Sequence, residues 1–496
     1  MDILQNLSLG FHVALSPTSL LFCLLGALIG TLVGILPGIG AVTAIAMLLP
    51  LTFKLTPIES LIMLSGIYYG AHHAGSTTAI MLNMPGEPTS VVICMDGNPM
   101  ARQGRAGPAL FITAIGSFFA GCVATLIIAG LSPILAEASL AFGPTEYAAI
   151  IVMALVIASA LSANSMITTI AMAMLGLLIG VVGTDVSTGA PRFTFGNPHL
   201  ADGVSFVAVA VGLFAISEIV SNMGLTIPVA AIGTKIGRLL PSRDDLMRSW
   251  KPILRGTTLG AAFGVLPGTG PLLSSFASYA LERRLAKDPA RFGHGAIEGV
   301  AGPESANNAA ALTHFIPMLT LGIPAGAAMA LLLSALQIHG IVPGPGVVRD
   351  HPDLFWGIVA SMWIGNLMLL VLNLPMVGLW IRLLAIPYRL LYPAILVFSC
   401  IGVYSVNNST FDVLIAAAFG VLGLIFKQLR CSPAPLALAL ILEPVLEDNF
   451  RRAMIISHGN PTAFVTHPIS LGILILTVAL AAFFLRRPKP GTLLEQ

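Results

Sequence analysis

Long apolar runs, separated by short polar or basic loops, follow one another along almost the whole chain. The runs cover approximately residues 20–50, 57–82, 108–131, 144–182, 204–231, 256–280, 305–340, 354–381, 391–404, 411–426, 433–446 and 469–485. A helix of about 20 apolar residues is long enough to cross a bilayer. The pattern therefore predicts an all-α polytopic membrane protein with about 10–12 transmembrane segments.

A ladder of glycines that ends in Pro-Gly-x-Gly occurs twice. Residues 26–40 read GALIGTLVGILPGIG and residues 256–270 read GTTLGAAFGVLPGTG, so matched positions lie 230 residues apart. Regularly spaced small residues let membrane helices pack closely. Proline lacks an N–H and glycine permits a sharp turn. Each copy therefore predicts a close-packed helix that breaks at its Pro-Gly.

A second pair of predicted breaks follows the first. Asn83-Met84-Pro85-Gly86 resembles Gly322-Ile323-Pro324-Ala325 at an offset of 239 residues. The nine extra residues are placed most simply in the basic loop 281–301. Two pairs of matching breaks indicate that the chain contains an internal repeat with broken helices.

The basic residues indicate how the two copies are oriented. Six Lys or Arg residues lie in 232–255 and four in 283–291, so both flanks of 256–280 are predicted to face the cytoplasm. That segment is then a re-entrant helical hairpin. The first copy has only Lys54 nearby, which indicates the opposite side. We predict inverted repeats, with a first transmembrane repeat at 1–231, a basic cytoplasmic connection at 232–255 and a second transmembrane repeat at 256–496.

Composition narrows the class of function. Only 9% of the residues are charged, against about 25% in soluble domains. The net charge is +2 and no basic block stands apart from the membrane loops, so we expect no nucleic-acid partner. The five cysteines have neither metal-ligand nor disulfide spacing, and the first twenty residues lack signal-peptide features. We expect no cofactor, no resident metal and no cleaved leader.

The predicted breaks supply the candidate chemistry. Breaking a helix in a membrane frees N–H groups that suit a carboxylate and carbonyls that suit Na⁺. Glu87 and Glu304 are candidates for cation or proton coupling; the alternative is a helix cap or an interfacial loop carboxylate. The candidate substrate- and ion-binding residues are Pro37, Gly38, Gly40, Ser76, Thr77, Thr78, Asn83, Pro85, Gly86, Glu87, Pro267, Gly268, Gly270, Glu304, Asn307, Asn308, Gly322 and Pro324.

Other polar residues in apolar runs are interpreted as structural. His72, His73 and His314 have no spaced acidic partner that would complete a metal site, so we interpret them as interior or interfacial histidines. Glu218 is a candidate to pair with a neighbouring helix.

The stretches around the predicted breaks resemble those of a known family. The stretches GILPGIGA, YYGAHHAGSTTAIMLNMPGEPTSVV, DGNPMARQGRAGPAL, GAIEGVAGPESANNAAA and MLTLGIPAG resemble the large permease subunit of the tripartite tricarboxylate transporter family. The resemblance implies a cation-gradient-driven carboxylate importer of the bacterial inner membrane. It also implies a small membrane subunit of about four helices, a periplasmic solute-binding protein and elevator-type movement. His72-His73 and Thr313-His314 depart from the family pattern, and these departures bear on the identity of the solute.

The sequence thus predicts a multi-pass permease that imports a di- or tricarboxylate such as citrate with Na⁺ or H⁺. One alternative is an intramembrane enzyme, but the chain lacks a nucleophile–base pair. The other is a passive anion channel, but a channel needs a continuous pore, whereas paired broken helices better suit an occluding site. The sequence contains no P-loop, G-x-S-x-G or H-E-x-x-H motif.

Overall fold

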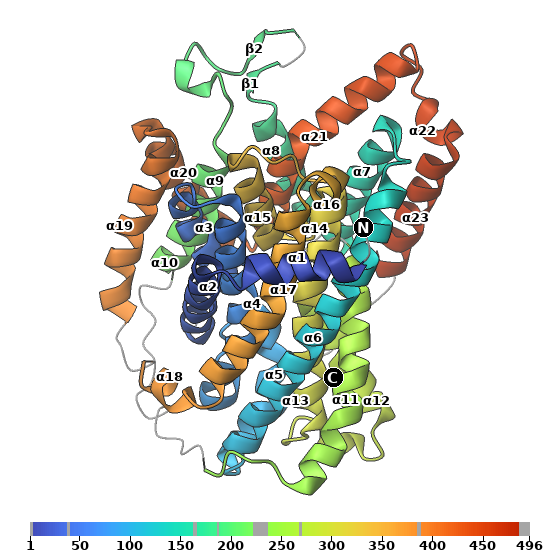
Figure 1. Cartoon of the computed structure of the whole chain (residues 1–496). Helices are drawn as coiled ribbons and strands as arrows, with labels where there is room; N and C mark the ends of the chain where they lie inside the picture. The colour runs from blue at the N-terminus through green and yellow to red at the C-terminus, as the bar shows by residue number, and fades with distance from the viewer. Residues whose placement is uncertain are drawn as a thin grey trace.

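The computed structural model describes residues 3–36, 40–161, 166–185, 188–221, 237–266, 270–383 and 388–485. This part of the chain is almost entirely helical (Figure 1), and the predicted all-α polytopic class is confirmed. The first half contains α1 (Ile3–Ala14), α2 (Pro17–Ile35), α3 (Gly40–Thr52), α4 (Pro57–Leu82), η1 (Pro88–Ser90), α5 (Val91–Arg102), α6 (Ala106–Ser139), α7 (Pro144–Leu161), α8 (Met166–Gly180), β1 (Gly183–Thr184), β2 (Pro191–Arg192), η2 (Pro198–Leu200), α9 (Phe206–Ala210), the π-helical segment η3 (Val211–Ile216) and α10 (Ser217–Ser221).

The regular elements of the second half, among its described residues, are all helices. It contains α11 (Arg243–Val265), α12 (Gly270–Leu285), η5 (Pro289–Arg291), α13 (Glu298–Thr313), α14 (Phe315–Leu321), α15 (Ala327–Ile338), α16 (Pro345–Asp350), α17 (Pro352–Asn373), α18 (Val377–Leu383), α19 (Tyr388–Asn407), α20 (Thr410–Gln428), α21 (Ala434–Ile456), α22 (Ala463–Thr466) and α23 (Pro468–Leu485). The one described sheet is the β1–β2 hairpin, in which Gly183 pairs antiparallel with Arg192.

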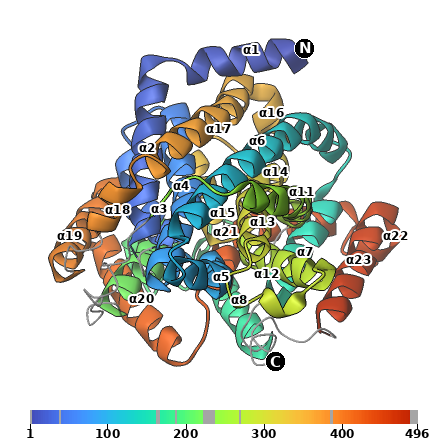
Figure 2. The same cartoon turned by 90° about the horizontal axis from the view of Figure 1, so that it is seen from below.

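Four described helices, α2, α6, α17 and α20, are long and apolar enough to cross a bilayer by themselves. Seven further apolar helices are shorter, among them α3 and α15, which begin directly after predicted breaks. Seen from below, α13 lies near the centre, whereas α1, α19 and α23 lie at the rim (Figure 2). Every residue of α4 from Ser60 to Leu82 and of α13 from Gly299 to Thr313 is buried. These two helices therefore form the core of the bundle.

Local sequence signals explain where the central helices begin and end. Thr56 caps α4 in a reciprocal capping box with Glu59, and Pro57 occupies the first turn, where no N–H is needed. The helix ends at Asn83, which adopts a left-handed conformation with φ 58°. Gly322 ends α14 in the same way with φ 70°. These two ends lie 239 residues apart, as the predicted repeat requires.

The glycine ladders fix the packing within each half. In the first half Gly26, Gly30 and Gly34 face the backbone of Met63, Ile67 and Ala71 in α4. In the second half Gly256, Gly260 and Gly264 face the backbone of Gly302, Ala306 and Ala310 in α13. The glycines differ by 230 positions and their partners by 239, which are the two offsets found in the sequence. In both helix pairs the residue numbers of the contacting positions increase in the same direction. Helix α2 therefore runs parallel to α4, and α11 runs parallel to α13.

Because α2 and α4 are parallel, α3 must bring the chain back across the same distance before α4 begins. For the same reason, α12 must bring the chain back between α11 and α13. For the second copy an ion pair demonstrates this hairpin directly. Arg255 near the middle of α11 binds both carboxylate oxygens of Glu282 near the end of α12. The two arms therefore run antiparallel, as predicted for 256–280.

The two halves are oppositely oriented where they meet. Tyr68 of α4 contacts His314, just after α13, with 3.2 Å between the hydroxyl and Nδ1. Farther along α4, Ser76 lies beside Glu304 in α13. From the first contact to the second, the residue number rises from 68 to 76 in α4 and falls from 314 to 304 in α13. These core helices are therefore antiparallel. This relationship agrees with the predicted inversion. The proposed boundary between the repeats includes residues 222–236, which lie outside the described residues.

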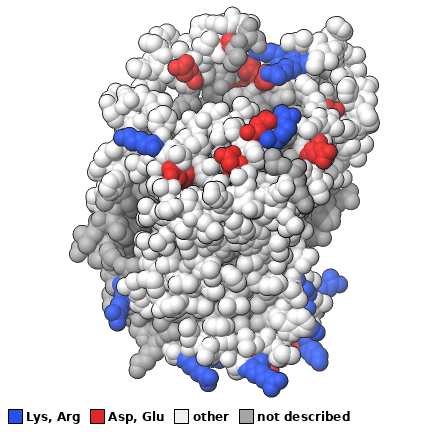
Figure 3. Space-filling view, viewed as in Figure 1, with Lys and Arg blue, Asp and Glu red and all other residues white. Residues whose placement is uncertain are grey.

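Charge distinguishes the two ends of the molecule. Lys and Arg side chains gather along the lower edge, where α5, α11 and α12 lie, whereas acidic and basic side chains mix near the top (Figures 1 and 3). Cytoplasmic surfaces of membrane proteins are enriched in Lys and Arg. We therefore call the lower end the inner face and the upper end, with β1 and β2, the outer face.

Glu218 pairs with Lys427 of α20 at 3.1 Å, which confirms the predicted helix–helix pair.

Candidate functional site

A cluster of buried polar side chains lies where α4 and α13 cross. Besides the Tyr68–His314 and Ser76–Glu304 contacts, His72 lies beside Asn307. Thr89, just before α5, also faces His72, at 3.5 Å from Nδ1. The site thus combines side chains from both halves of the chain at the centre of the bundle.

Glu304 supplies a carboxyl group at this crossing. Its side chain is fully buried, and Oε1 accepts hydrogen bonds from the Ser117 hydroxyl at 2.8 Å and from the Asn308 amide at 3.0 Å. Asn308 also donates to the Ser117 oxygen at 2.8 Å. The Ser76 hydroxyl donates to the carbonyl of His73 instead. The second carboxylate oxygen, Oε2, has no hydrogen-bond partner among the described residues.

Several other buried polar atoms of the cluster are also unused. The amide N–H₂ of Asn307, Nε2 of His314 and the hydroxyl of Ser90 have no partner among the described residues. Buried polar groups in proteins are nearly always hydrogen-bonded, and leaving one unpaired costs about 1–3 kcal/mol. A site for a polar ligand would need unpaired donors and acceptors of this kind, gathered in one place.

Glu87 binds the start of α3, the half-helix that follows the first predicted break. Its carboxylate accepts a hydrogen bond from the N–H of Ala41, in the first turn of α3. A methyl group at Gly40, which has φ 67°, would lie 3.5 Å from the same carboxylate. The positive end of the half-helix is therefore bound by a carboxylate of the chain itself. This is the helix-cap alternative considered for Glu87.

The second copy lacks this cap. Gly270 begins α12 with φ 63°, and a methyl group there would meet no described atom within 4 Å. The residue 239 positions after Glu87 is Gly326, which carries no side chain. The two repeats share their backbone plan, but they differ in charge at the start of the returning half-helix.

Gly86 places Glu87 by close backbone packing. The N–H of Gly86 donates to the carbonyl of Gly75 at 3.4 Å, and a side chain at Gly86 would collide with the carbonyl of Gly34. Any side chain at Gly75 would in turn press against Glu87 and Ser90. Three glycines therefore let the connection after α4 fold back against the centre of that helix.

The predicted site residues separate into distinct groups. Gly40, Ser76, Gly86, Glu87, Glu304, Asn307 and Asn308 lie at or beside the central cluster, and Thr77 and Thr78 are buried on the same part of α4. Asn83 is exposed and Pro85 half-buried at the inner end of α4, while Gly322 and Pro324 lie at the end of α14. Pro37, Gly38, Pro267 and Gly268 lie outside the described residues, and Gly270 begins α12.

Asp96 is a structural anchor that the sequence analysis did not single out. Its Oδ1 accepts hydrogen bonds from the N–H groups of Gly293, Gly295 and Ala296 at 2.8–2.9 Å, and Oδ2 accepts one from the Tyr279 hydroxyl at 2.9 Å. Asp96 lies on α5, whereas its partners lie on α12 and in the turn before α13. One carboxylate therefore joins the two halves near the inner face.

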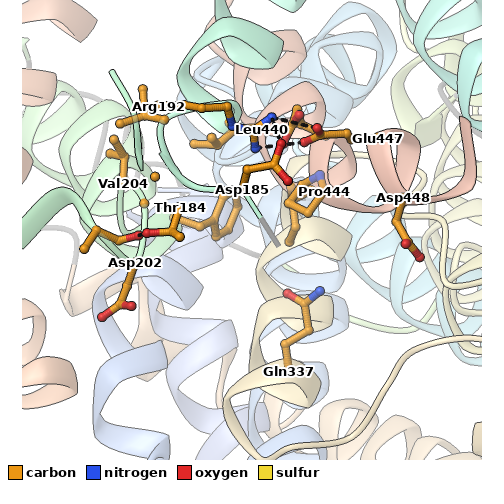
Figure 4. Close-up of a pocket in the computed structure, with 18 of the residues that line it drawn as sticks. Thr184, Asp185, Arg192, Asp202, Val204, Gln337, Leu440, Pro444, Glu447 and Asp448 are labelled. Carbon is orange, nitrogen blue, oxygen red and sulfur yellow. Dashed lines mark hydrogen bonds and ion pairs between the residues drawn. The ribbon is translucent and has the colours of Figure 1, made fainter. Parts of the chain in front are cut away.

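A charged pocket at the outer face was also missed. Its volume is about 480 Å³, and it lies between the β1–β2 loop, α21 and Gln337 of α15 (Figure 4). Arg192 binds both oxygens of Glu447, and Arg451 binds both oxygens of Asp185. The Arg192 guanidinium holds the pKa of the Glu447 carboxyl below its usual range. These pairs join residues more than 250 positions apart, so no local pattern reveals them.

The described residues contain no group of three or more His, Cys, Asp or Glu side chains that could hold a metal ion. The cluster around His72 is therefore built from neutral polar groups and one carboxylate, Glu304, with Glu87 bound nearby. Such a set can donate to and accept from a polar solute or surround a small cation.

Comparison with known proteins places the chain in a family. Residues 20–438 match the model of the tripartite tricarboxylate transporter TctA family. The chain belongs to the TctA family. The resemblance recognised in the sequence is confirmed, and membership identifies a transporter family rather than an enzyme family.

Two proteins of Agrobacterium vitis are similar to this chain. One is described as an uncharacterized 52.8 kDa protein in the TAR-I ttuC' 3'region, and it is 53% identical over 97% of this chain and 95% of its own length. The other, in the TAR-II ttuC' 3'region, is 59% identical over 45% of this chain and 93% of its own length. A solved manganese transporter of Eremococcus coleocola is aligned over 94% of each chain at 15% identity, with a TM-score of 0.12.

Proposed function

We propose that this TctA family protein is the permease subunit of a secondary transporter that imports a di- or tricarboxylate across the bacterial inner membrane. A Na⁺ or H⁺ gradient drives the import. The observation that carries the proposal is the crossing of α4 and α13, where two oppositely oriented helices bury a cluster of unpaired polar groups. Broken helices from inverted repeats, with a polar site between them, are the architecture of secondary transporters.

The chemistry of the cluster favours a carboxylated solute. His314 offers an unused ring nitrogen, and Asn307 offers an unused amide N–H₂ group. Neutral donors of this kind bind a carboxylate while retaining reversibility, because they avoid a buried ion pair that would hold the solute too strongly. The start of α12 adds the positive end of a half-helix to the same half of the protein.

The packing supports an elevator-type movement. Each ladder of glycines holds two parallel helices in backbone contact, so α2 with α4 and α11 with α13 behave as rigid pairs. The contact between the pairs is polar and contains unpaired groups. Displacement of one rigid pair against its surroundings exposes the cluster to one side of the membrane at a time.

We further propose that the transporter works with a periplasmic solute-binding protein and a small four-helix membrane subunit. The binding protein delivers solute at the outer face, where the charged pocket beside α15 opens (Figure 4). Support for these partners comes from family membership, because the family is described as tripartite.

The test is uptake of radiolabelled citrate, and of other di- and tricarboxylates, into proteoliposomes that contain this chain and its small subunit. Purified binding protein is added outside, and Na⁺ and H⁺ gradients are imposed separately. The proposal predicts uptake that requires a gradient and the binding protein. Gradient-independent leakage of anions favours a channel, and chemical conversion of the solute favours an intramembrane enzyme; either result contradicts the proposal.

A further inference from the structure

A groove near the inner face combines an apolar wall with two arginines. Its volume is about 350 Å³, and its lining comes from α12, α5 and η5. On the apolar side Met95 and Phe276 are half-buried and Ala280 is exposed. Arg283 and Arg284 also line the groove; both are exposed, and the described residues provide neither of them with an ion-pair partner. The groove therefore offers apolar surface and free positive charge together.

The lining residues of α12 follow one face of the helix. Phe276, Ala280 and the two arginines occur at the spacing i, i+4, i+7 and i+8, which places them on one stripe. The apolar residues occupy the part of the stripe nearer the break before α12, and the arginines occupy the part nearer the inner face. The groove thus changes from apolar to basic in the direction of the cytoplasm.

Helix geometry gives the depth of these residues in the membrane. Helix α12 begins at Gly270, directly after the predicted break, so Phe276 lies about 9 Å and Arg283 about 20 Å along the helix from its start. In transporters built from broken helices the breaks lie near the midplane, from which hydrocarbon extends about 15 Å to each side. Phe276 therefore lies at the depth of the acyl chains, and both arginines lie at the depth of the lipid headgroups.

The charges around the arginines favour an anion. Lys287 adds a third exposed cation, and the one acid between residues 283 and 288 is Asp288, which accepts a hydrogen bond from a backbone N–H of η5. Two other acids of this region are already bound, because Glu282 pairs with Arg255 and Asp96 accepts four hydrogen bonds. The inner rim of the groove is therefore positive, in agreement with the Lys and Arg side chains that gather along the lower edge in Figure 3.

We propose that this groove binds one anionic phospholipid of the inner leaflet, with its phosphate on Arg283 and Arg284 and an acyl chain against Phe276. Guanidinium groups bind phosphate oxygens through paired hydrogen bonds, and basic pockets on the cytoplasmic side of membrane helices bind anionic headgroups. A free phosphate would use the arginines but leave the apolar wall in water. A zwitterionic lipid would bring a further cation to a rim that is already positive.

The groove lies at a junction between the two halves of the chain. Met95 belongs to α5 in the first half, whereas Phe276 and the arginines belong to the hairpin of the second half. Tyr279 also lines the groove, and its hydroxyl donates to Asp96, the residue after Met95. A lipid in the groove would therefore contact both sides of the junction that Asp96 holds. Because it binds the assembled junction, it would stabilise the hairpin against α5.

The experiment is native mass spectrometry of the delipidated full-length protein in a neutral detergent. The protein is titrated with phosphatidylglycerol, with phosphatidylcholine of the same acyl chains, or with inorganic phosphate. The wild-type protein is expected to bind the first phosphatidylglycerol more tightly than phosphatidylcholine, and to bind no phosphate at the same concentration.

The double variant Arg283→Gln/Arg284→Gln should weaken binding of phosphatidylglycerol about tenfold or more. Arg238→Gln/Arg243→Gln is the matched control, because it removes the same charge from two other exposed arginines near the inner face that have no ion-pair partner among the described residues. This control should bind the lipid as wild type does. Ala280→Trp fills the groove from an exposed position without changing the charge, and it should weaken binding in the same direction.

Equal affinity of wild type and Arg283→Gln/Arg284→Gln for phosphatidylglycerol overturns the proposal, with folding checked by gel filtration and melting temperature. Equal affinity of wild type for the two lipids also overturns it. Binding of inorganic phosphate as tight as that of the lipid would mean a site for a small anion instead. Variants that lose the small membrane subunit but keep the lipid would make the groove a protein interface, which contradicts the proposal. Carboxylate uptake is not part of the readout, so the result is independent of the proposed import function.

Discussion

The hydroxyl of Tyr68 lies 3.2 Å from Nδ1 of His314, and this contact joins residues 246 positions apart in opposite halves of the chain. Tyr68 also lies edge-on to His72, with ring centroids 4.7 Å apart. The two histidines are thus held by one tyrosine at the crossing of α4 and α13. Their orientation is set by the fold rather than by solvent.

Loss of this contact should impair transport. Tyr68→Phe removes one buried hydrogen bond, worth about 1 kcal/mol, and leaves the His314 ring free to turn. We expect transport to fall about fivefold.

His314→Ala should reduce uptake or change the preference among di- and tricarboxylates. Tyr404→Phe, at an exposed tyrosine, serves as the matched control. Unchanged uptake and selectivity in His314→Ala would remove the histidine from the solute site.

The glycine ladders should tolerate no side chain where helices touch. A β-carbon at Gly260 would overlap the carbonyl of Ala306, so Gly260→Ala forces α11 away from α13. We expect a loss of about 1–3 kcal/mol in stability and a lower melting temperature in detergent. Gly130→Ala, in α6, meets no described atom within 4 Å and should not lower the melting temperature. Equal melting temperatures for both variants would argue against backbone contact at the ladder.

A bulky residue at Gly86 should abolish transport without preventing membrane insertion. Gly86→Val would collide with the carbonyl of Gly34 and displace Glu87 from the start of α3. Uptake in proteoliposomes and protease protection of the inserted protein would be measured together. Normal uptake by Gly86→Val would mean that this connection does not form part of the site.

Asp96 should hold the turn before α13 in place. Asp96→Asn keeps one acceptor oxygen for the backbone N–H groups, but it removes the charge that strengthens all four hydrogen bonds and turns an N–H₂ group toward the Tyr279 hydroxyl, so stability should fall by roughly 2–3 kcal/mol. Tyr279→Phe removes a single hydrogen bond and should cost about 1 kcal/mol. Limited proteolysis within 286–297 would report the loosening. Resistance equal to wild type in Asp96→Asn would show that this carboxylate is not an anchor.

The outer charged pocket should respond to acid in a defined direction. Because Arg192 lowers the pKa of Glu447 in the folded protein, the pair is stabilising at neutral pH and is lost as the pH falls through that lowered pKa. Arg192→Gln should therefore release the β1–β2 loop at a higher pH than wild type. A fluorophore at Thr194→Cys in a cysteine-free protein would report the release, with Arg349→Gln as the control at another outer arginine. Release at the same pH in all three proteins would contradict the role of this pair.

The sequence predicted the relationships that arise from repeated local patterns. The offsets of 230 and 239 residues identified the two glycine ladders and the paired helix ends at Asn83 and Gly322, and the basic flanks of 256–280 identified the hairpin that Arg255 and Glu282 close. Partners that depend on the folded arrangement were not accessible. Nothing near Asp96 indicates the turn at 293–296. A helix cap was one alternative for Glu87, but nothing near it indicates that α3 is the helix it caps.

Solute counterflow tests most directly whether the crossing of α4 and α13 is exposed alternately to the two sides of the membrane, as we propose. Proteoliposomes are loaded with unlabelled carboxylate and placed in a trace of the labelled solute without an ion gradient. An alternating-access carrier predicts transient accumulation of label above equilibrium, and this accumulation should be lost in Gly86→Val and kept in Gly130→Ala. Entry of label that ignores the internal solute and stops at equilibrium would contradict the account and indicate a channel.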